Sequence, residues 1–300
     1  MAEPTIVVAL DTSELSEGTI PYAMTLAKAT GSRLSFVTVW EGAERALIES
    51  LPDVADDLFK RGENYYEEYL KGIAKRVREQ GVNTEAEVRA GDASEEIVRV
   101  AQDRGARMVA LASHGRSGIS RWMAGSVAGE LIRESPVPTL IVGPHALEQG
   151  PGAGAIRRIL APLDGSDTAE TALPLAAELA VALKAEVYLA QSLRWVTQAF
   201  IYGVPEVTIE SMDQQIEQAA QEYLTKAKAK LPQGVTVKTA VVRGMPADSL
   251  IDLVAERDID LVVMATHARG GFAKLALGSV ADRMIHGKAP VLLVRGEEPA

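Results

Sequence analysis

Residues 9–13 read Ala-Leu-Asp-Thr-Ser, and residues 162–166 read Pro-Leu-Asp-Gly-Ser. The two stretches are 153 residues apart (162 minus 9). The same offset relates His114 to His267, and it relates Gly-Ser-Val-Ala at 125–128 to the same four residues at 278–281. A single offset that holds from residue 9 to residue 128 indicates a tandem duplication of one domain.

The boundary between the copies follows from composition. Residues 143–155 are rich in Gly, Pro and Ala and lack hydrophobic periodicity, which is typical of a linker. We therefore expect a first domain at 1–144, a linker at 145–155 and a second domain at 156–300. A chain of 300 residues suits two domains of about 150 residues each.

Each copy alternates short apolar runs with segments of helical periodicity. This alternation predicts an α/β fold, with two tandem, doubly wound, five-stranded parallel sheets that carry helices on both faces. The predicted strands of the first copy are 5–10, 34–40, 82–90, 108–112 and 138–142, and its helices are 14–30, 55–80, 93–104 and 122–134. Those of the second copy are strands 158–163, 185–191, 234–242, 260–265 and 290–294, with helices 167–183, 208–230, 246–256 and 275–286.

Composition excludes several classes of protein. The chain has no cysteine, which rules out disulfides, thiolate metal sites and cysteine catalysis. The 31 basic residues are outnumbered by 41 acidic ones, so nucleic acid is not an expected partner. The chain has no apolar run of membrane-spanning length and no signal-like start, so we expect a cytoplasmic protein without a membrane partner. Four histidines without metal-ligand spacing predict no metal site.

A doubly wound sheet binds ligands beyond the carboxyl ends of its strands, at the point where the strand order reverses. The segments that follow the first and fourth strands are therefore the candidate site. They are residues 11–13 and 113–115 in the first copy, and 164–166 and 266–268 in the second. The duplication has also kept these segments the most alike.

A phosphate cradle is one interpretation of the segment after the fourth strand. Gly115 permits an unusual backbone path, Gly125-Ser126 opens a helix whose free N–H groups favour an anion, and Arg116 and Arg121 add positive charge. The alternative is that Ser126 is only a helix cap and that the glycines only form turns.

Asp11 and His114 also have two interpretations each. The Asp11 carboxylate could accept a hydrogen bond from a ribose or adenine, or help to hold Mg²⁺ through water; alternatively it forms an Asx turn or helix cap. His114 and its counterpart His267 most simply shape their loops. Because no nucleophile-elbow motif accompanies them, we expect no hydrolytic triad and no enzyme activity.

At these residues the chain resembles the universal stress protein family, in its tandem two-domain form. The ATP-binding members of that family carry Gly-x-x-Gly, nine further residues, and then Gly-Ser or Gly-Thr. The first copy has Ala112-Ser-His-Gly115 and, after nine residues, Gly125-Ser126. The second has Ala265-Thr-His-Ala268 and, after nine residues, Gly278-Ser279, so both early glycines are alanine there.

The resemblance implies a strand order of 3-2-1-4-5 and a site for ATP, with Mg²⁺ alongside it. Asp11 and Asp164 would lie at the adenine and ribose end, and the backbone of Val39 would meet the adenine edge, with Gln191 at the corresponding place in the second copy. The full candidate set is Ala9, Asp11, Thr12, Val39, Ala112, His114, Gly115, Arg116, Gly125, Ser126 and Val127, with Pro162, Asp164, Gly165, Gln191, Ala265, His267, Ala268, Gly278, Ser279 and Val280.

The predicted function is therefore that of an ATP-binding stress-response protein, a sensor or regulator with little or slow hydrolysis. The alternative is an interaction scaffold of the same fold that binds no nucleotide. An enzyme that uses an adenylate is less supported, because no second substrate domain is evident. The resemblance also implies that the two halves pair through their last strands, with homodimers as a further possibility. A Cβ at Ala268 would weaken binding in the second copy if the backbone there is left-handed.

Overall fold

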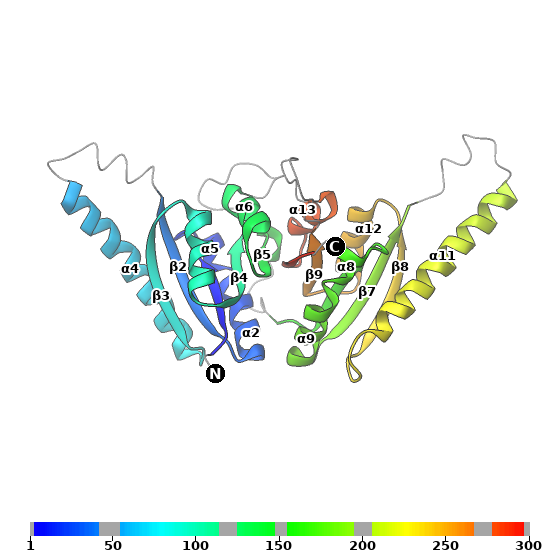
Figure 1. The fold of residues 1–300 in the computed structure, drawn as a ribbon, viewed down its shortest axis with the longest axis horizontal. Helices are drawn as coiled ribbons and strands as arrows, with labels where there is room; N and C mark the ends of the chain where they lie inside the picture. Colours follow the sequence, from blue (N-terminus) through cyan, green and yellow to red (C-terminus); the bar gives the residue numbers. More distant parts are fainter. Residues whose placement is uncertain are drawn as a thin grey trace. The chain divides into compact units, whose positions relative to one another are not determined.

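The computed structural model describes residues 3–41, 55–113, 125–147, 155–194, 206–266 and 278–296. The chain divides into two compact units, Met1–Ala155 and Ile156–Ala300. Each unit forms around its own parallel sheet, flanked by helices (Figure 1). The α/β class predicted from the alternation of elements is confirmed.

In the first unit the strands follow the order β3-β2-β1-β4-β5, as the resemblance implied. The buried strand β1 is a run of apolar and β-branched residues, and Ile6, Val7 and Val8 are fully buried, as expected for a central parallel strand. The strands are β1 (Thr5–Ala9), β2 (Arg33–Glu41), β3 (Thr84–Gly91), β4 (Ala106–Ala112) and β5 (Thr139–Val142).

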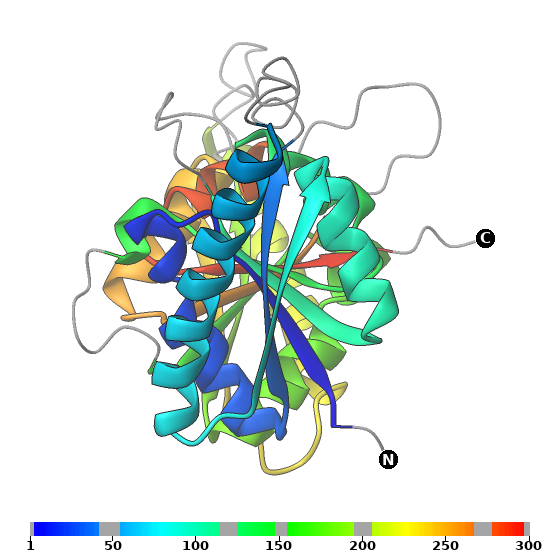
Figure 2. The same ribbon diagram turned by 90° about the vertical axis from the view of Figure 1, so that its left-hand side faces the viewer.

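The helices of the first unit cover both faces of its sheet. The connections from β1 to β2 and from β2 to β3 advance in one direction across the sheet, whereas the connection from β3 to β4 returns. Because such crossovers are right-handed, α2 and α4 cover one face, and α5 and α6 the other. Figures 1 and 2 show α4 and α5 on opposite sides of β2 and β3. The helices are α1 (Glu14–Glu17), α2 (Ile20–Thr30), α4 (Ala55–Glu79), α5 (Ala93–Asp103), α6 (Ser126–Glu134) and α7 (Pro144–Leu147).

The second unit repeats this arrangement, with strand order β8-β7-β6-β9-β10. Its strands are β6 (Arg158–Leu163), β7 (Glu186–Leu193), β8 (Val237–Arg243), β9 (Leu261–Thr266) and β10 (Val291–Arg295). Its helices are α8 (Asp167–Glu170), α9 (Leu173–Leu183), α11 (Glu206–Ala229), α12 (Pro246–Glu256) and α13 (Ser279–Ile285). Within the described ranges, none of the helices has the length and apolar character needed to cross a membrane.

The prediction of one continuous helix after the first strand of each unit is wrong. Residues 14–30 form α1 and α2 with a break at Gly18 and Thr19, and residues 167–183 form α8 and α9. Pro21 and Pro174 each lie in the first turn of the second helix. Proline lacks an N–H and would clash with the preceding turn of an unbroken helix, so the helix restarts just before it.

A short helix, α7, lies in the segment that the sequence assigned to the linker. Its Ala146 is completely buried, and the buried hydroxyl of Tyr22 in α2 donates a hydrogen bond of 2.9 Å to the Ala146 carbonyl oxygen. The first residues of the predicted linker, which form α7, therefore pack against the first unit.

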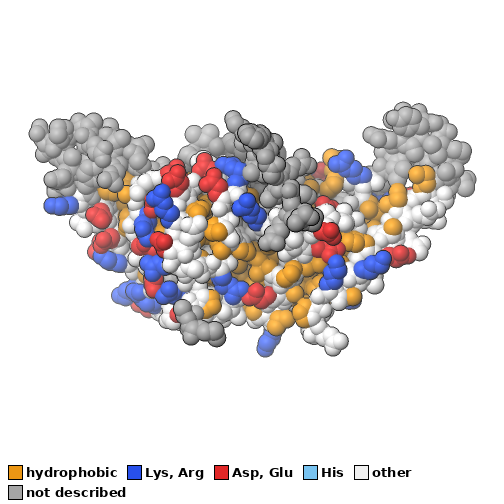
Figure 3. All heavy atoms as spheres, viewed as in Figure 1, with side chains coloured by type: hydrophobic (Ala, Val, Ile, Leu, Met, Phe, Trp, Pro, Cys, Tyr) orange, Lys and Arg blue, Asp and Glu red, His pale blue; other side chains and the backbone are white. Residues whose placement is uncertain are grey.

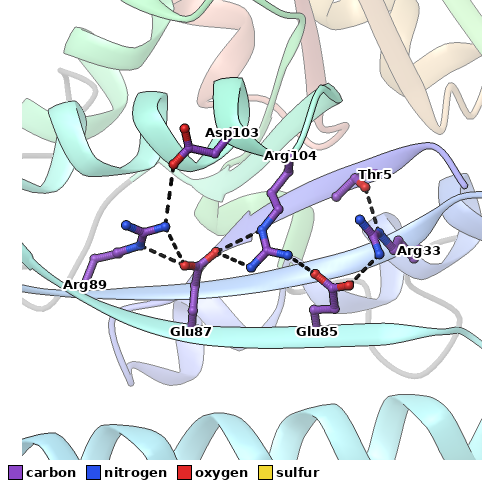
Figure 4. A network of polar contacts seen from close by, with 7 residues as sticks. All are labelled: Thr5, Arg33, Glu85, Glu87, Arg89, Asp103 and Arg104. Carbon is purple, nitrogen blue, oxygen red and sulfur yellow. Dashed lines mark hydrogen bonds and ion pairs between the residues drawn. The ribbon is translucent and has the colours of Figure 1, made fainter. Parts of the chain in front are cut away.

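An ion-pair network covers the edge strand β3 on the side of α5 (Figure 4). The Glu85 carboxylate contacts both Arg33 on β2 and Arg104 at the end of α5, and Arg104 also reaches Glu87 at 3.1 Å. The network contains Thr5, Arg33, Glu85, Glu87, Arg89, Asp103 and Arg104. Figure 3 shows acidic and basic side chains interspersed over the part of the first unit that holds β3 and α5. Charges along an edge strand discourage pairing with other strands.

The second unit has the reverse charges at the same place. Glu186 on β7 takes the position of Arg33, and Lys238 on β8 takes that of Glu85, each at the 153-residue offset. Strand register supports the match, because Ser35 lies opposite Glu85 and Tyr188 lies opposite Lys238. The Lys238 ammonium is 2.9 Å from the Glu186 carboxylate.

Candidate functional site

The central strands of each sheet separate at their carboxyl ends. The β1–β4 ladder ends at Val8 and Ala110, although β1 stays paired with β2 to Ala9 and β4 stays paired with β5 to Ala112. Successive strands are added on one side of β1 up to β3 and then on its other side from β4 onward, so the strand order reverses between β1 and β4. This is the switch point at which a doubly wound sheet binds ligands.

In the second unit the β6–β9 ladder ends earlier, at Leu160 and Val262. Pro162 follows on β6, where it stays in register with Ala190 on β7. Proline has no N–H for a second ladder, so it fits a central strand only where pairing on one side has ended. Of the other candidates, Ala265 lies in β9, next to Thr266 at the carboxyl end of that strand.

Asp11 forms a tight turn immediately after β1. Its Oδ1 accepts hydrogen bonds from the Ser13 amide (3.0 Å) and the Ser13 hydroxyl (2.5 Å). The Ser13 hydroxyl oxygen in turn accepts from the Ser16 amide (3.1 Å) and caps α1. One carboxylate oxygen of Asp11 thus has the structural role that the sequence left open, and a contact between Asp11 and a ligand stays a prediction.

The second unit builds the same turn, but with glycine in place of threonine after the aspartate. Asp164 Oδ1 accepts from the Ser166 amide (2.9 Å) and hydroxyl (2.6 Å). The next residue is left-handed in both units: Gly165 has φ of 89°, and Thr12 has φ of 68°. Glycine adopts this conformation readily, whereas a β-branched residue is strained there by roughly 1–3 kcal/mol. Asp164 and Gly165 are exposed, whereas Asp11 and Thr12 are half-buried.

The amino terminus of α6 lies at the carboxyl end of β4. The Gly125 amide donates to the Ser113 carbonyl oxygen (2.8 Å), and the Ser113 amide donates to the Val142 carbonyl oxygen at the end of β5 (3.0 Å). Gly125 is the N-cap residue and provides no side-chain acceptor for the first turn of the helix. Because the N–H groups of a first turn have no partner inside the helix, those of Ser126 and Val127 suit an anion.

The corresponding helix of the second unit, α13, also begins after a glycine cap, Gly278, and its first residues are Ser279 and Val280. It has seven residues against nine in α6.

Val39 and Gln191 do not occupy corresponding positions, which corrects the assignment made from the sequence. Ala9 lies opposite Val37 and Pro162 lies opposite Ala190, so Gln191 matches Thr38, and Ser192 matches Val39. Since side chains alternate across a strand, Val39 and Gln191 point to opposite faces of their sheets.

Five predicted site residues lie outside the described residues. They are His114, Gly115, Arg116, His267 and Ala268, and Arg121 of the predicted phosphate cradle lies outside them as well. The described residues hold no group of three or more His, Asp or Glu side chains that could bind a metal ion.

A half-buried tyrosine, with its hydroxyl oxygen buried, lies near the Asp turn in each unit. Burial and the negative charges of Glu17 and Asp11 raise the pKa of Tyr69 well above its usual value, so the phenol is neutral near pH 7. Tyr223 is raised in the same way by burial, Glu170 and Asp164. Each phenol oxygen is buried and lacks a partner at hydrogen-bond geometry within the described parts of the chain. No role in the site was predicted for these tyrosines from the sequence, although a tyrosine occurs at this place in both long helices, α4 and α11, and that recurrence is the signal that could have found them.

The comparisons with known proteins agree with the fold. The model of the universal stress protein family matches residues 4–143 and again residues 155–295. A universal stress protein of Methanocaldococcus jannaschii is 32% identical over 147 residues, which cover 48% of this chain and 85% of that protein.

A universal stress protein of Mycobacterium bovis is 29% identical over 191 residues, covering 63% of this chain and 62% of that relative, so the match spans less than two thirds of its length. The crystal structure of a universal stress protein from Archaeoglobus fulgidus is similar with a TM-score of 0.71 and 19% identity, over 98% of this chain and 99% of that one. This last likeness concerns the fold alone.

Proposed function

The chain belongs to the universal stress protein family, and from that premise we propose that its first unit binds an adenine nucleotide, ATP with Mg²⁺. The observation that carries the proposal is the meeting of two features at the switch point. The amino terminus of α6, whose N-cap residue Gly125 has no side chain, is hydrogen-bonded to Ser113 at the end of β4. The Asp11 turn follows β1, where the β1–β4 ladder has ended.

Each feature suits one part of the nucleotide. The Asp11 carboxylate would accept hydrogen bonds from the ribose or adenine, and the backbone of Val39 would meet the adenine edge. The N–H groups of Ser126 and Val127 would bind phosphate. Mg²⁺ generally binds to one or two carboxylates together with substrate phosphates, so it would arrive with ATP, and Asp11 would help to hold it through water.

We infer a role as a sensor or regulator, because the described part of the site offers binding groups and no arranged nucleophile. Asp11 Oδ1 already accepts two hydrogen bonds from Ser13, which suits a fixed acceptor better than a general base. Hydrolysis should therefore be slow, and steady release of phosphate or AMP at many turnovers would contradict this part of the proposal.

The first unit should bind more tightly than the second. Its Asp turn is half-buried rather than exposed, so a contact made there is better shielded from water. A chain that binds no nucleotide in either unit would instead favour the scaffold function.

The test is the removal of one backbone N–H. Ser126 is the first residue of α6, where proline is well tolerated, and Gly125 has φ of −56° and ψ of 160°, which suits a residue before proline. Ser126→Pro should weaken MgATP binding by about ten-fold in a calorimetric titration, because one charge-assisted hydrogen bond is lost.

Two controls accompany this variant. Ser126→Ala removes only the hydroxyl, so it separates the side chain from the amide. Ser279→Pro makes the same change in the second unit, where Gly278 has a compatible φ of −54° and ψ of 141°. Equal affinities for wild type and Ser126→Pro would place the phosphates elsewhere.

A further inference from the structure

Ser16 links the two ends of the Asp11 turn. Its side chain belongs to α1 and is 3% exposed. The Ser16 hydroxyl donates to the Ser13 carbonyl oxygen (2.8 Å) and accepts from the Asp11 amide (3.3 Å). Together with the bonds from Ser13 to Oδ1, this hydroxyl fixes Asp11 at its backbone as well as at its carboxylate.

The hydroxyl oxygen of Tyr69 on α4 is buried next to Ser16. Arg76 is two helical turns further along the same face of α4, and its guanidinium is 2.9 Å from the Glu17 carboxylate, so this face of α4 meets α1. The Tyr69 hydroxyl is buried beside Ser16 and Glu17. A hydrogen bond that is shielded from water holds its partners more firmly than an exposed one.

Thr12 shows why such support is needed. The residue is β-branched and has φ of 68°, a conformation that persists only where its surroundings enforce it. The hydrogen bonds of Ser13 and Ser16 fix Asp11 and Ser13, the residues on either side of Thr12, and so hold Thr12 in this conformation.

The second unit is a natural control for this arrangement. It keeps the tyrosine, the glutamate and a cation, as Tyr223, Glu170 and Lys230, and Lys230 forms an ion pair with Glu170. At the position of Ser16 it has Ala169, and at the position of Thr12 it has the unstrained Gly165. The second turn therefore lacks the hydroxyl, and it does not need to hold a strained residue.

We propose that Ser16, backed by Tyr69, is a positioning residue that presets Asp11 for the nucleotide, and that its replacement by alanine is one reason for weaker binding in the second unit. The inference rests on the proposed function for its consequence, but the support of Asp11 by Ser16 is a property of the free protein. The two can therefore be tested separately.

The first experiment is a double-mutant cycle on MgATP affinity, measured by calorimetry in the full chain. Ser16→Ala should weaken binding by about five-fold in the wild-type background, the value of one hydrogen bond. In an Asp11→Asn background it should have almost no further effect, because Ser16 acts through Asp11. Tyr69→Phe should weaken binding less. Equal losses in both backgrounds would show that Ser16 acts only on general stability and would overturn the proposal.

The second experiment needs no nucleotide. Amide hydrogen exchange, followed by NMR, should be at least about five-fold faster at Asp11 in Ser16→Ala. Leu10 is the internal reference, because its amide donates to the Val37 carbonyl oxygen of β2 (2.9 Å) and should not change. Ala169→Ser should slow exchange at Asp164.

Unchanged exchange at Asp11, or equal acceleration at Leu10, would refute the positioning role whether or not ATP binds. Conversely, faster exchange at Asp11 in Ser16→Ala, together with a wild-type chain that binds no ATP, would refute the proposed function and leave the support of Asp11 by Ser16 intact.

Discussion

Two glycines illustrate how backbone conformation decides the effect of a single residue. Gly72 is an exposed residue within α4, where an added Cβ would meet nothing within 4 Å. Gly165 has φ of 89°, and its added Cβ would make only an ordinary contact, 3.9 Å from Gln191 Nε2. The difference between the two sites is therefore conformational and not one of space.

The same substitution should accordingly have opposite effects at these sites. Gly72→Ala should stabilise the chain by about 0.5–1 kcal/mol, because glycine is unfavourable inside a helix. Gly165→Ala should destabilise it by about 1–2 kcal/mol, because an L-residue is strained in the left-handed region. Urea denaturation of both variants checks the signs, and a stabilising Gly165→Ala would contradict a left-handed backbone at residue 165.

At this scale the sequence predicts residue types better than their geometry. The recurrence of Asp11 as Asp164 marks the turn, but only the structure shows that Oδ1 is occupied by Ser13. Gln191 is not the counterpart of Val39, because both units keep the same strand register and the 153-residue offset leads from Val39 to Ser192. Candidates such as Gly115 fall outside the described residues and stay predictions.

Among the elements, the strands were predicted well and the first helix of each unit was not. A continuous run of apolar and β-branched residues predicts a buried parallel strand, and β1 has such a run. The break between α1 and α2 depends on Pro21, whose effect competes with helical periodicity that continues on both sides of it. Whether the helix continues or breaks at such a proline depends on how the segment packs against the sheet, and a sequence pattern does not show that packing.

The ion pair between Arg33 on β2 and Glu85 on β3 should contribute measurably to the free energy of unfolding. Glu85 contacts two arginines, so Glu85→Lys should cost roughly 1–2 kcal/mol of unfolding free energy, at about 0.2–1 kcal/mol for each lost pair plus the new repulsion. Arg33→Glu together with Glu85→Lys recreates the order of charges found in the second unit. This double variant should recover part of the loss, because Arg104 still faces the new lysine.

Salt is the control for that prediction. The difference between Glu85→Lys and wild type should shrink in 1 M NaCl, where the screening length falls to about 3 Å. A loss that is independent of salt would indicate altered packing of β3 and not lost charge pairing.

For the whole molecule, the proposal predicts one dominant nucleotide site per chain. Ligand at about 100 times its dissociation constant stabilises the native state by roughly 2.7 kcal/mol. In a unit of this size that corresponds to a rise of roughly 5–10 °C in the midpoint of thermal unfolding. Calorimetric scans with MgATP should therefore show one transition that rises strongly.

Asp11→Asn and Asp164→Asn form a matched pair for this measurement, since both amides retain the oxygen that accepts from the following serine. Asp11→Asn should abolish most of the rise, and Asp164→Asn should leave it nearly intact. Equal effects of the two variants would mean that both units bind the nucleotide with similar affinity. The pairing of the halves through their last strands stays a prediction, which the oligomeric state in solution would test.

The reversed ion pairs also bear on how a duplicated gene changes. Two similar halves invite unequal recombination, and a crossover between β2 and β3 would join Arg33 to Lys238, or Glu186 to Glu85. Either hybrid unit would place like charges side by side on neighbouring strands, at a cost to its stability. Each half thus carries its own matched pair of charges, and the sign of the pair distinguishes the strands of one half from those of the other.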